Sequence, residues 1–393
     1  MSDTIPVGGT CAREFQAVRD TFLTNFTDHD DVGAAVAVWV EGDLVVNLWG
    51  GYADARHRRR WREDTLASVF SGTKGLTSTC VHLLAERGEI DLYAPVASYW
   101  PEFAQNGKQD ITVAAVLGHR SGVIGPRTRL HWNDTTDWDR VCAEIAASEP
   151  WWEPNTAQGY HMVTFGFILG EVVRRVTGRT IGQYLRTEIA EPMGIDVHIG
   201  LPAAEHQRCA EMVNKPHIRD VLANSQAPGH PTSLDEHPMA GLSIAMGFVP
   251  DDELGSNEIT RWRSAEFPGT NGHVSALGLA TFYNGLAQEK LLSRQHLESV
   301  RVSQGGFDPD VVLGPRVADH GWGLGYMLNQ RGVAGPNLRS FGHGGSGGSY
   351  GFVDLENRIG YAYVMNYFDA TKCNADPRST ALSDEVYRAI GVL

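Results

Sequence analysis

The sequence has few cysteines and lacks the motifs on which metal and nucleotide sites are built. Its five cysteines are scattered along 393 residues, and no two of them form a C-x-x-C pair. There is also no H-E-x-x-H, no G-x-x-x-x-G-K-[ST], and no G-x-G-x-x-G between an expected strand and an expected helix. Zinc, phosphate and dinucleotide sites depend on such spacings. We therefore expect no metal and no cofactor, and the odd, scattered thiols are typical of the reducing cytoplasm.

Basic charge and long apolar runs are also scarce. The chain has 33 Lys and Arg against 47 Asp and Glu, a net charge of −14. Nucleic acids and anionic membranes bind basic surfaces, so neither is an expected partner. The longest clean apolar run, residues 32–40, is too short to cross a bilayer, and the first ten residues do not have the pattern of a signal peptide. These features favour a cytoplasmic protein that acts on a small molecule, and they are compatible with a homo-oligomer.

What the sequence does contain is a strand-like pattern at both ends and a helix-like pattern between them. Residues 32–49 form two β-rich runs around Glu41-Gly42-Asp43, and residues 348–367 form two more around a turn at 355–358. Apolar residues recur at helical spacing in 15–26, 76–84 and 164–178, and a last helix is expected over 379–390. This order predicts an α+β fold, with an antiparallel sheet flanked by helices and an additional all-helical domain.

The same pattern predicts the domain boundaries. Residues 1–70 and 290–393 are expected to form one α/β domain from both termini, and residues 71–289 a mainly helical domain inserted between them. Residues 205–270 are rich in Pro, Gly, His and Asp and have weak periodicity. They are expected to form long surface loops, of the kind that often shape a binding site.

A serine and a lysine stand three residues apart in VFSGTKGLTSTC, residues 69–80. Positions i and i+3 share one face of a helix, so Lys74 is within reach of the Ser71 hydroxyl. A serine needs a base to become a nucleophile, and a lysine is a base only when its pKa is lowered, for example by an apolar setting. A capping serine followed by a surface lysine is the simpler alternative. The chain has only five lysines, however, and Lys74 alone has a serine three residues before it.

Two matches to G-x-S-x-G, at 344–348 and 347–351, are interpreted differently. In hydrolases this motif carries a nucleophile only at a strand-to-helix turn that is followed by Asp and then His. Here strand-like sequence follows, and no histidine occurs after His343. We therefore interpret Ser346 and Ser349 as parts of a Gly-rich backbone and not as nucleophiles.

Two further elements are suited to chemistry beside the serine. Tyr160 precedes the helix expected over 164–178, and a tyrosine near a lysine ammonium can act as a base or proton shuttle. An ordinary tyrosine at a domain surface is the alternative. The glycines of FGHGGSGGSYG, residues 341–351, let a strand approach a ligand, and its N–H groups suit an oxyanion hole. A turn or β-bulge explains the same glycines.

Taken in order, the three elements resemble the active-site motifs of the serine β-lactamase and penicillin-binding protein superfamily. The matching stretches are Ser71-Gly72-Thr73-Lys74, Tyr160-His161-Met162 and His343-Gly344-Gly345. The resemblance is strongest to the family VIII carboxylesterases, which are related to class C β-lactamases. It spans nearly the whole chain, through LWGGYAD, ITVAAVLGHRSGV, GYHMVTFGFILGEVVRRVTG and FGHGGSGGSYGFVDLENRIGYAYVMN.

The resemblance implies a carboxylic ester hydrolase that works through an acyl-enzyme. Ser71 would be acylated, Lys74 and Tyr160 would form the general-base network, and the N–H groups of Ser71 and Ser346 would form the oxyanion hole. Trp322 is a further candidate for the pocket, although a core position explains it equally well. The residues expected to contact substrate are therefore His343, Gly344, Gly345 and Trp322.

The sequence departs from the lactamase pattern in two of the three motifs. Y-x-N is replaced by Tyr160-His161-Met162, and K-T-G by His343-Gly344-Gly345. A K-T-G lysine suits the carboxylate of a β-lactam, whereas a histidine is mostly neutral at pH 7. We therefore expect short-chain, neutral esters to be preferred. An acyltransferase of the same fold and a protein that binds or hydrolyses β-lactams are the alternatives.

Overall fold

The computed structural model describes residues 5–128, 130, 134–213, 257–305, 310–313, 321–369 and 376–393. Its main sheet has eight strands in the order β1-β3-β2-β11-β10-β9-β8-β7. At the centre β2 pairs with β11 in antiparallel register, with Ala34 opposite Met365. The prediction of a sheet built from both ends of the chain is therefore confirmed. The strands are β1 (Val7–Cys11), β2 (Gly33–Val40), β3 (Asp43–Gly51), β7 (Gly321–Trp322), β8 (Met327–Leu328), β9 (Phe341–Gly344), β10 (Tyr350–Asp354) and β11 (Ile359–Met365).

Two short turns connect the central strands. Between β2 and β3, Glu41 and Gly42 have φ angles of 52° and 90°, as a two-residue type I′ hairpin turn requires. Between β10 and β11 the chain turns through residues 355–358, and Arg358 has a φ of 52°. Because successive side chains in a strand point to opposite faces, these turns decide which residues each face of the sheet presents.

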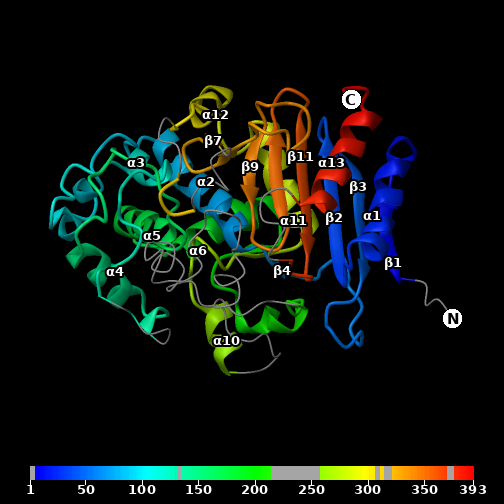
Figure 1. The fold of residues 1–393 in the computed structure, drawn as a ribbon, viewed down its shortest axis with the longest axis horizontal. Helices are drawn as coiled ribbons and strands as arrows, with labels where there is room; N and C mark the ends of the chain where they lie inside the picture. The colour runs from blue at the N-terminus through cyan, green and yellow to red at the C-terminus, as the bar shows by residue number, and fades with distance from the viewer. Residues whose placement is uncertain are drawn as a thin grey trace.

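Helices cover both faces of this sheet, as Figure 1 shows. Val36 of β2 belongs to a buried cluster with Phe22 of α1 (Gln16–Asp28) and Leu382 of α13 (Pro377–Ala389). Its neighbour Ala35 belongs to a second cluster with Leu279 of α11 (Ala276–Ala287). The period of two in β2 thus sorts its side chains between α1 and α13 on one face and α11 on the other.

The remaining helices gather beside the β9 side of the sheet (Figure 1). The first of them, α2 (Thr73–Glu86), contacts α5 and α6 as well as β9. Its N-terminus therefore lies where the sheet meets the helices. A small second sheet has the order β4-β6-β5. The other helices of this region and the strands of the second sheet are α3 (Val113–Leu117), α4 (Trp138–Ala147), α5 (Thr164–Thr177), α6 (Ile181–Leu185), α7 (Glu191–Met193), α12 (Arg294–Val300), β4 (Ala67–Ser68), β5 (Val197–His198) and β6 (His273–Val274).

Two features differ from the expectation for residues 71–289. Helix α11 lies inside that range but packs against β2, β10 and β11. Within 205–270, predicted to be loops, α10 (Asn257–Ser264) is a helix, and a 3₁₀ helix (Ala203–Arg208) overlaps the start of the segment. The short α10 buries only Ile259 and Trp262 as hydrophobic residues, too few for a clear periodic signal. Residues 214–256 lie outside the described part of the chain, and the division into two domains stays a prediction.

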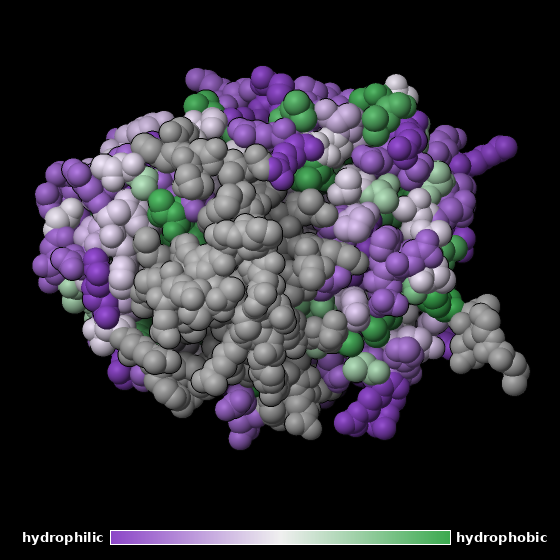
Figure 2. Space-filling view, in the orientation of Figure 1, coloured by the Kyte–Doolittle hydropathy of each residue, from purple (hydrophilic) through white to green (hydrophobic). Residues whose placement is uncertain are grey.

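Most of the coloured surface in Figure 2 is hydrophilic, and its hydrophobic residues form small separate patches. Exposed large hydrophobic residues such as Tyr93 and Leu338 are widely separated in sequence, and scattered ones are normal for a globular protein. No helix among the described residues combines the length and the apolar composition that a membrane span needs.

Candidate active site

Ser71 lies in a 3₁₀ turn (Phe70–Gly72) that leads directly into α2. Phe70, just before it, has a φ of 43°, in the left-handed region that non-glycine residues rarely adopt. The Thr73 hydroxyl donates to the Phe70 carbonyl and accepts the Gly272 N–H, which supports the strained turn. Strain of this kind tends to occur at functional sites. The Ser71 side chain is half-buried, so it keeps an exposed surface at the helix N-terminus.

Lys74 is completely buried one turn further along α2. Its Nζ lies 2.8 Å from the Gly269 carbonyl oxygen, 2.9 Å from that of Met162 and 3.4 Å from Ser71 Oγ. Burial lowers the pKa of Lys74 well below its usual value, because the charged form loses its hydration. An uncharged amine donates its two N–H groups to the two carbonyls, which leaves its lone pair for the serine proton.

Tyr160, in the segment before α5, lies beside the same lysine. Lys74 Nζ is 4.6 Å from the centre of the Tyr160 ring. The ring stacks on Trp322, with centroids 5.1 Å apart and planes at 20°, and only 6% of Tyr160 is exposed. The structure thus brings Ser71, Lys74 and Tyr160 together from two distant segments, while their roles stay predictions.

The chain leaving β9 passes very close to the turn that carries Ser71. A Cβ atom on Gly345 would lie only 2.1 Å from the Val69 carbonyl oxygen, and a Cβ on Gly72 would lie 3.8 Å from the His343 carbonyl oxygen. Real Cβ atoms do not approach other atoms to 2.1 Å. Only glycine at 345 therefore allows this approach of the two backbones.

Beyond this approach the Gly-rich segment forms a tight turn. The Gly345 N–H donates to the Ser349 carbonyl at 2.7 Å, and the Gly348 N–H donates to the Gly345 carbonyl at 3.2 Å. Ser346 and Gly347 are the central residues of this turn, and Ser346 is half-buried. Strand β9 precedes the turn and β10 follows it. The G-x-S-x-G matches are therefore part of a strand–turn–strand, as predicted from the sequence.

The other predicted substrate-binding residues divide into two groups. The rings of His343 and Trp322 lie 5.8 Å apart and form one aromatic cluster with Tyr160. Gly344 instead donates its N–H to the Met327 sulfur at 3.5 Å and accepts the His343 Nδ1–H at 2.7 Å through its carbonyl. The aromatic cluster is therefore close to Tyr160, whereas the backbone groups of Gly344 are satisfied within the protein.

Sequence reasoning missed two residues that support Tyr160. The His119 ring lies 4.8 Å from that of Tyr160 and 4.5 Å from that of Trp322, and its Nδ1 accepts the His161 N–H at 3.1 Å. Burial, together with the nearby histidines and lysine, lowers the pKa of His119, so the ring is neutral. Asp310 accepts the Tyr160 N–H at 3.2 Å. The sequence signal for His119 is its place in the family-like stretch ITVAAVLGHRSGV, whereas no sequence signal marks Asp310.

His161, at the first departure from the lactamase motifs, is completely buried. Its ring nitrogens lie 2.7 Å from the Gly159 carbonyl and 2.6 Å from the Ser121 hydroxyl. Burial lowers the pKa of His161 to about 4, so this histidine is a neutral structural residue. Across the described ranges, no group of three or more His, Cys, Asp or Glu is arranged to hold a metal ion.

Comparison with known proteins assigns this arrangement to a family. The Beta-lactamase family model matches residues 17–383. The chain belongs to the beta-lactamase family. The matched range contains Ser71, Lys74, Tyr160 and the turn after β9, so the whole cluster lies within the family's common fold.

Several members of the beta-lactamase family resemble this chain over most of its length. Esterase/beta-lactamase LipL of Mycobacterium tuberculosis is 32% identical over 372 residues, which are 92% of this chain and 83% of LipL. The crystal structure of a family VIII carboxylesterase is 41% identical with a TM-score of 0.85, and covers 98% of this chain and 100% of its own. A penicillin-binding protein homolog from Caulobacter crescentus is 34% identical with the same TM-score and coverage. These matches confirm the predicted family resemblance and α+β fold.

Proposed function

We propose that this chain is a serine carboxylesterase that hydrolyses short-chain carboxylic esters through an acyl-enzyme on Ser71. The observation that carries the proposal is the buried Lys74, whose amine lies 3.4 Å from the Ser71 hydroxyl and whose pKa is lowered by burial. The names of the relatives, an esterase/beta-lactamase and a family VIII carboxylesterase, support the same chemistry.

In the acylation step, the Lys74 amine takes the proton of the Ser71 hydroxyl while Ser71 Oγ bonds to the ester carbonyl carbon. The carbonyl oxygen becomes an oxyanion, and the N–H groups of Ser71 and Ser346 are proposed to stabilise it. Two observations support this hole. Ser71 is at a helix N-terminus, where the helix dipole favours negative charge, and the turn at Ser346 follows directly on the close contact between Gly345 and Val69.

Collapse of the tetrahedral intermediate breaks the ester C–O bond, and the leaving alcohol needs a proton. The new ammonium of Lys74 lies over the Tyr160 ring, where the ring face stabilises a cation. We propose that the Tyr160 hydroxyl delivers this proton to the alcohol. In deacylation the same pair accepts a proton from water while the hydroxide adds to the acyl carbon. The bond from the acyl carbon to Ser71 Oγ then breaks, the pair returns the proton to Ser71 Oγ, and the acid is released.

The test is p-nitrophenyl butyrate hydrolysis by wild type, Ser71→Ala and a control, Ser349→Ala. The Ser349 hydroxyl is buried and has no hydrogen-bond partner among the described residues, so its removal should be well tolerated. Loss of a serine nucleophile costs on the order of 10³-fold or more, and Ser349→Ala should stay within about threefold of wild type. Undiminished hydrolysis by Ser71→Ala would refute the proposal.

Hydrolysis of β-lactams is a second candidate, favoured by the name of the relative LipL. Position 343 carries histidine and not lysine, so we expect a weaker hold on a β-lactam carboxylate than on a neutral ester. Turnover of nitrocefin, measured beside turnover of p-nitrophenyl butyrate, shows whether the enzyme prefers a β-lactam or an ester. A higher kcat/KM for nitrocefin would reverse the assignment.

A further inference from the structure

Arg378, at the start of α13, is completely buried and uses all of its hydrogen-bond donors. Its guanidinium makes a two-bond contact with Asp376, with Nε 2.9 Å from Oδ1 and Nη2 2.6 Å from Oδ2. A guanidinium has five N–H donors in a fixed plane. The other three are directed at acceptors 2.6–3.1 Å away, which are Asp31 Oδ1 and the carbonyl oxygens of Tyr367 and Gly347.

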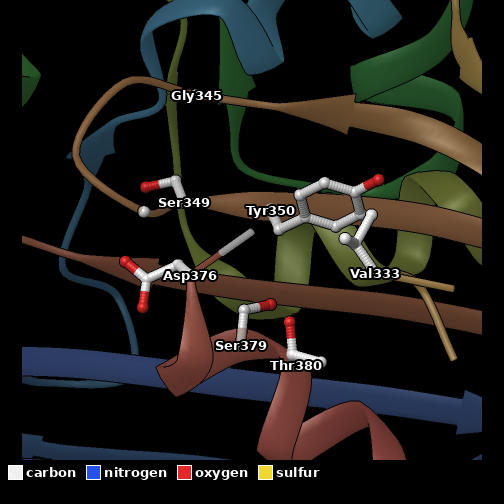
Figure 3. Close-up of a pocket in the computed structure, with 8 residues that line it drawn as sticks. Val333, Gly345, Ser349, Tyr350, Asp376, Ser379 and Thr380 are labelled. Atoms are coloured by element: carbon white, nitrogen blue, oxygen red, sulfur yellow. The ribbon is translucent and has the colours of Figure 1, made fainter. Parts of the chain in front are cut away.

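The last of these acceptors belongs to the turn beside Ser71. Gly347 has a φ of 90°, as the third position of a type II turn requires, and its carbonyl accepts from Arg378 Nη2 at 2.6 Å. The next residue packs directly on the ion pair, because a Cβ atom on Gly348 would lie 2.2 Å from Asp376 Oδ2. In Figure 3 the same Asp376 lies with Ser379 across a small cavity from Ser349 and Gly345. Helix α13 therefore supports the turn through its first residues.

A second contact limits the turn from another element. A Cβ atom on Gly347 would lie 2.6 Å from the Phe368 ring, and that ring makes an edge contact with Phe70, with centroids 5.5 Å apart. Phe70 immediately precedes Ser71. The turn is thus enclosed between Arg378 on one side and the ring pair of Phe368 and Phe70 on the other.

Burying charged groups at this place costs desolvation free energy, so packing alone does not explain them. Arg378 and Asp31 have fully buried side chains, and that of Asp376 is 3% exposed. Replacing such an ion cluster with apolar residues is often neutral or stabilising. What an apolar residue does not supply is a rigid donor for the Gly347 carbonyl, because the planar guanidinium is held in place by its other four bonds.

We propose that Arg378 is a positioning residue for the oxyanion hole. By holding the Gly347 carbonyl it fixes the orientation of the turn, so that the Ser346 N–H points at the developing oxyanion. This inference rests on the proposed function, since it assigns a purpose to the turn only if Ser71 is acylated. Arg378 itself does not touch the substrate.

The experiment compares Arg378→Lys with Tyr387→Phe. Lysine keeps the positive charge but loses the planar fork. Tyr387 is a matched control, because it lies on the same helix and its buried hydroxyl donates to Asp354 Oδ2 at 2.7 Å, away from the turn. We expect Arg378→Lys to lower kcat by about 10- to 100-fold with KM within about threefold, since a displaced oxyanion donor acts mainly on the transition state. Tyr387→Phe should keep kcat within about twofold of wild type, even where its Tm falls as far as that of Arg378→Lys.

Inhibition supplies a readout that loss of stability alone would not change. Phenylboronic acid forms a tetrahedral adduct with a serine, whereas butyrate resembles the bound product. In Arg378→Lys the affinity for the boronic acid should fall by the same factor as kcat/KM, and that for butyrate should not. If Arg378→Lys does not fold, Asp376→Asn takes its place. Asparagine keeps the cap on α13 but loses the charged partner, and a kcat loss of about 3- to 10-fold is expected.

Three results overturn the inference. They are a kcat within threefold of wild type in folded Arg378→Lys, an unchanged kcat in Asp376→Asn, and equal losses of boronic acid and butyrate affinity. Ser71→Ala is measured in the same assay. If Ser71→Ala is as active as wild type, the proposed function fails. If Ser71→Ala is inactive and Arg378→Lys is normal, only the role of Arg378 is refuted.

Discussion

The close approach of Gly345 to the turn before Ser71 allows a prediction with a magnitude set by the geometry. In Gly345→Ala the new methyl carbon would start 2.1 Å from the Val69 carbonyl oxygen, while ordinary contacts begin at 3.4 Å. The two backbones must therefore separate by about 1 Å, and a displacement of that size costs on the order of 10²-fold in rate. Because the Ser346 turn follows Gly345 directly, the loss should appear in kcat, with KM changed by less than about threefold.

The assay is steady-state hydrolysis of p-nitrophenyl butyrate, corrected for the concentration of folded enzyme. Gly342→Ala is the matched control, because Gly342 lies three residues earlier, within β9, and its Cβ would meet the Gly351 carbonyl oxygen at 2.1 Å, across the sheet and not toward Ser71. Both variants should lose stability, but Gly345→Ala should lose about tenfold more kcat per folded molecule. A folded Gly345→Ala with kcat within threefold of wild type, or equal kcat losses in the two variants, would refute the reasoning.

Four further predictions concern the site and the helices around it. Lys74→Arg should lose about 10³-fold in kcat/KM because arginine stays protonated. In wild type, burial lowers the pKa of the Lys74 base, so kcat/KM should fall as pH falls through that lowered pKa and the amine gains a proton. A kcat/KM that keeps rising up to the usual lysine pKa of 10.5 would contradict this. Tyr160→Phe keeps the ring on Trp322 but loses the hydroxyl, so kcat should fall about 10²- to 10⁴-fold with little change in Tm; a normal kcat would exclude Tyr160 as proton donor. Glu171→Ala removes a fully buried carboxylate that binds two arginines and the Trp138 indole N–H, so urea unfolding should show a loss of about 3 kcal/mol, and a loss under about 1 kcal/mol would contradict it.

The elements that could be predicted from the sequence are those with a strong local signal. Helix α5 was expected over 164–178, and it ends where Gly178 adopts a φ of 71°, as a helix C-terminus with glycine commonly does. The N-terminal hairpin was expected from Glu41-Gly42-Asp43 between two β-rich runs, and Gly42 supplies the positive φ that the turn needs. Each of these depends on residues within one turn of chain, so the pattern and the structure carry the same information.

The elements that were missed or misplaced depend on distant partners. The position of α11 on the sheet follows from its contacts with β2, β10 and β11, and an apolar helix packs equally well on a sheet or on other helices. The contacts of His119 and Asp310 likewise join distant parts of the chain. His119 accepts the N–H of His161, which lies 42 residues later, and Asp310 accepts the N–H of Tyr160, which lies 150 residues earlier. No local pattern marks such pairs.

The candidate site shows the same division within a single pair of residues. The position of Lys74 beside Ser71 follows from the local sequence, because a spacing of three residues places both side chains on one face of a helical turn. That the pKa of this lysine is lowered depends on the tertiary fold. Its two carbonyl partners, Met162 and Gly269, lie 88 and 195 residues away along the chain, and it is their packing around the amine that removes water and lowers its pKa. Geometry within a helix is local, whereas desolvation is a property of everything that folds around it.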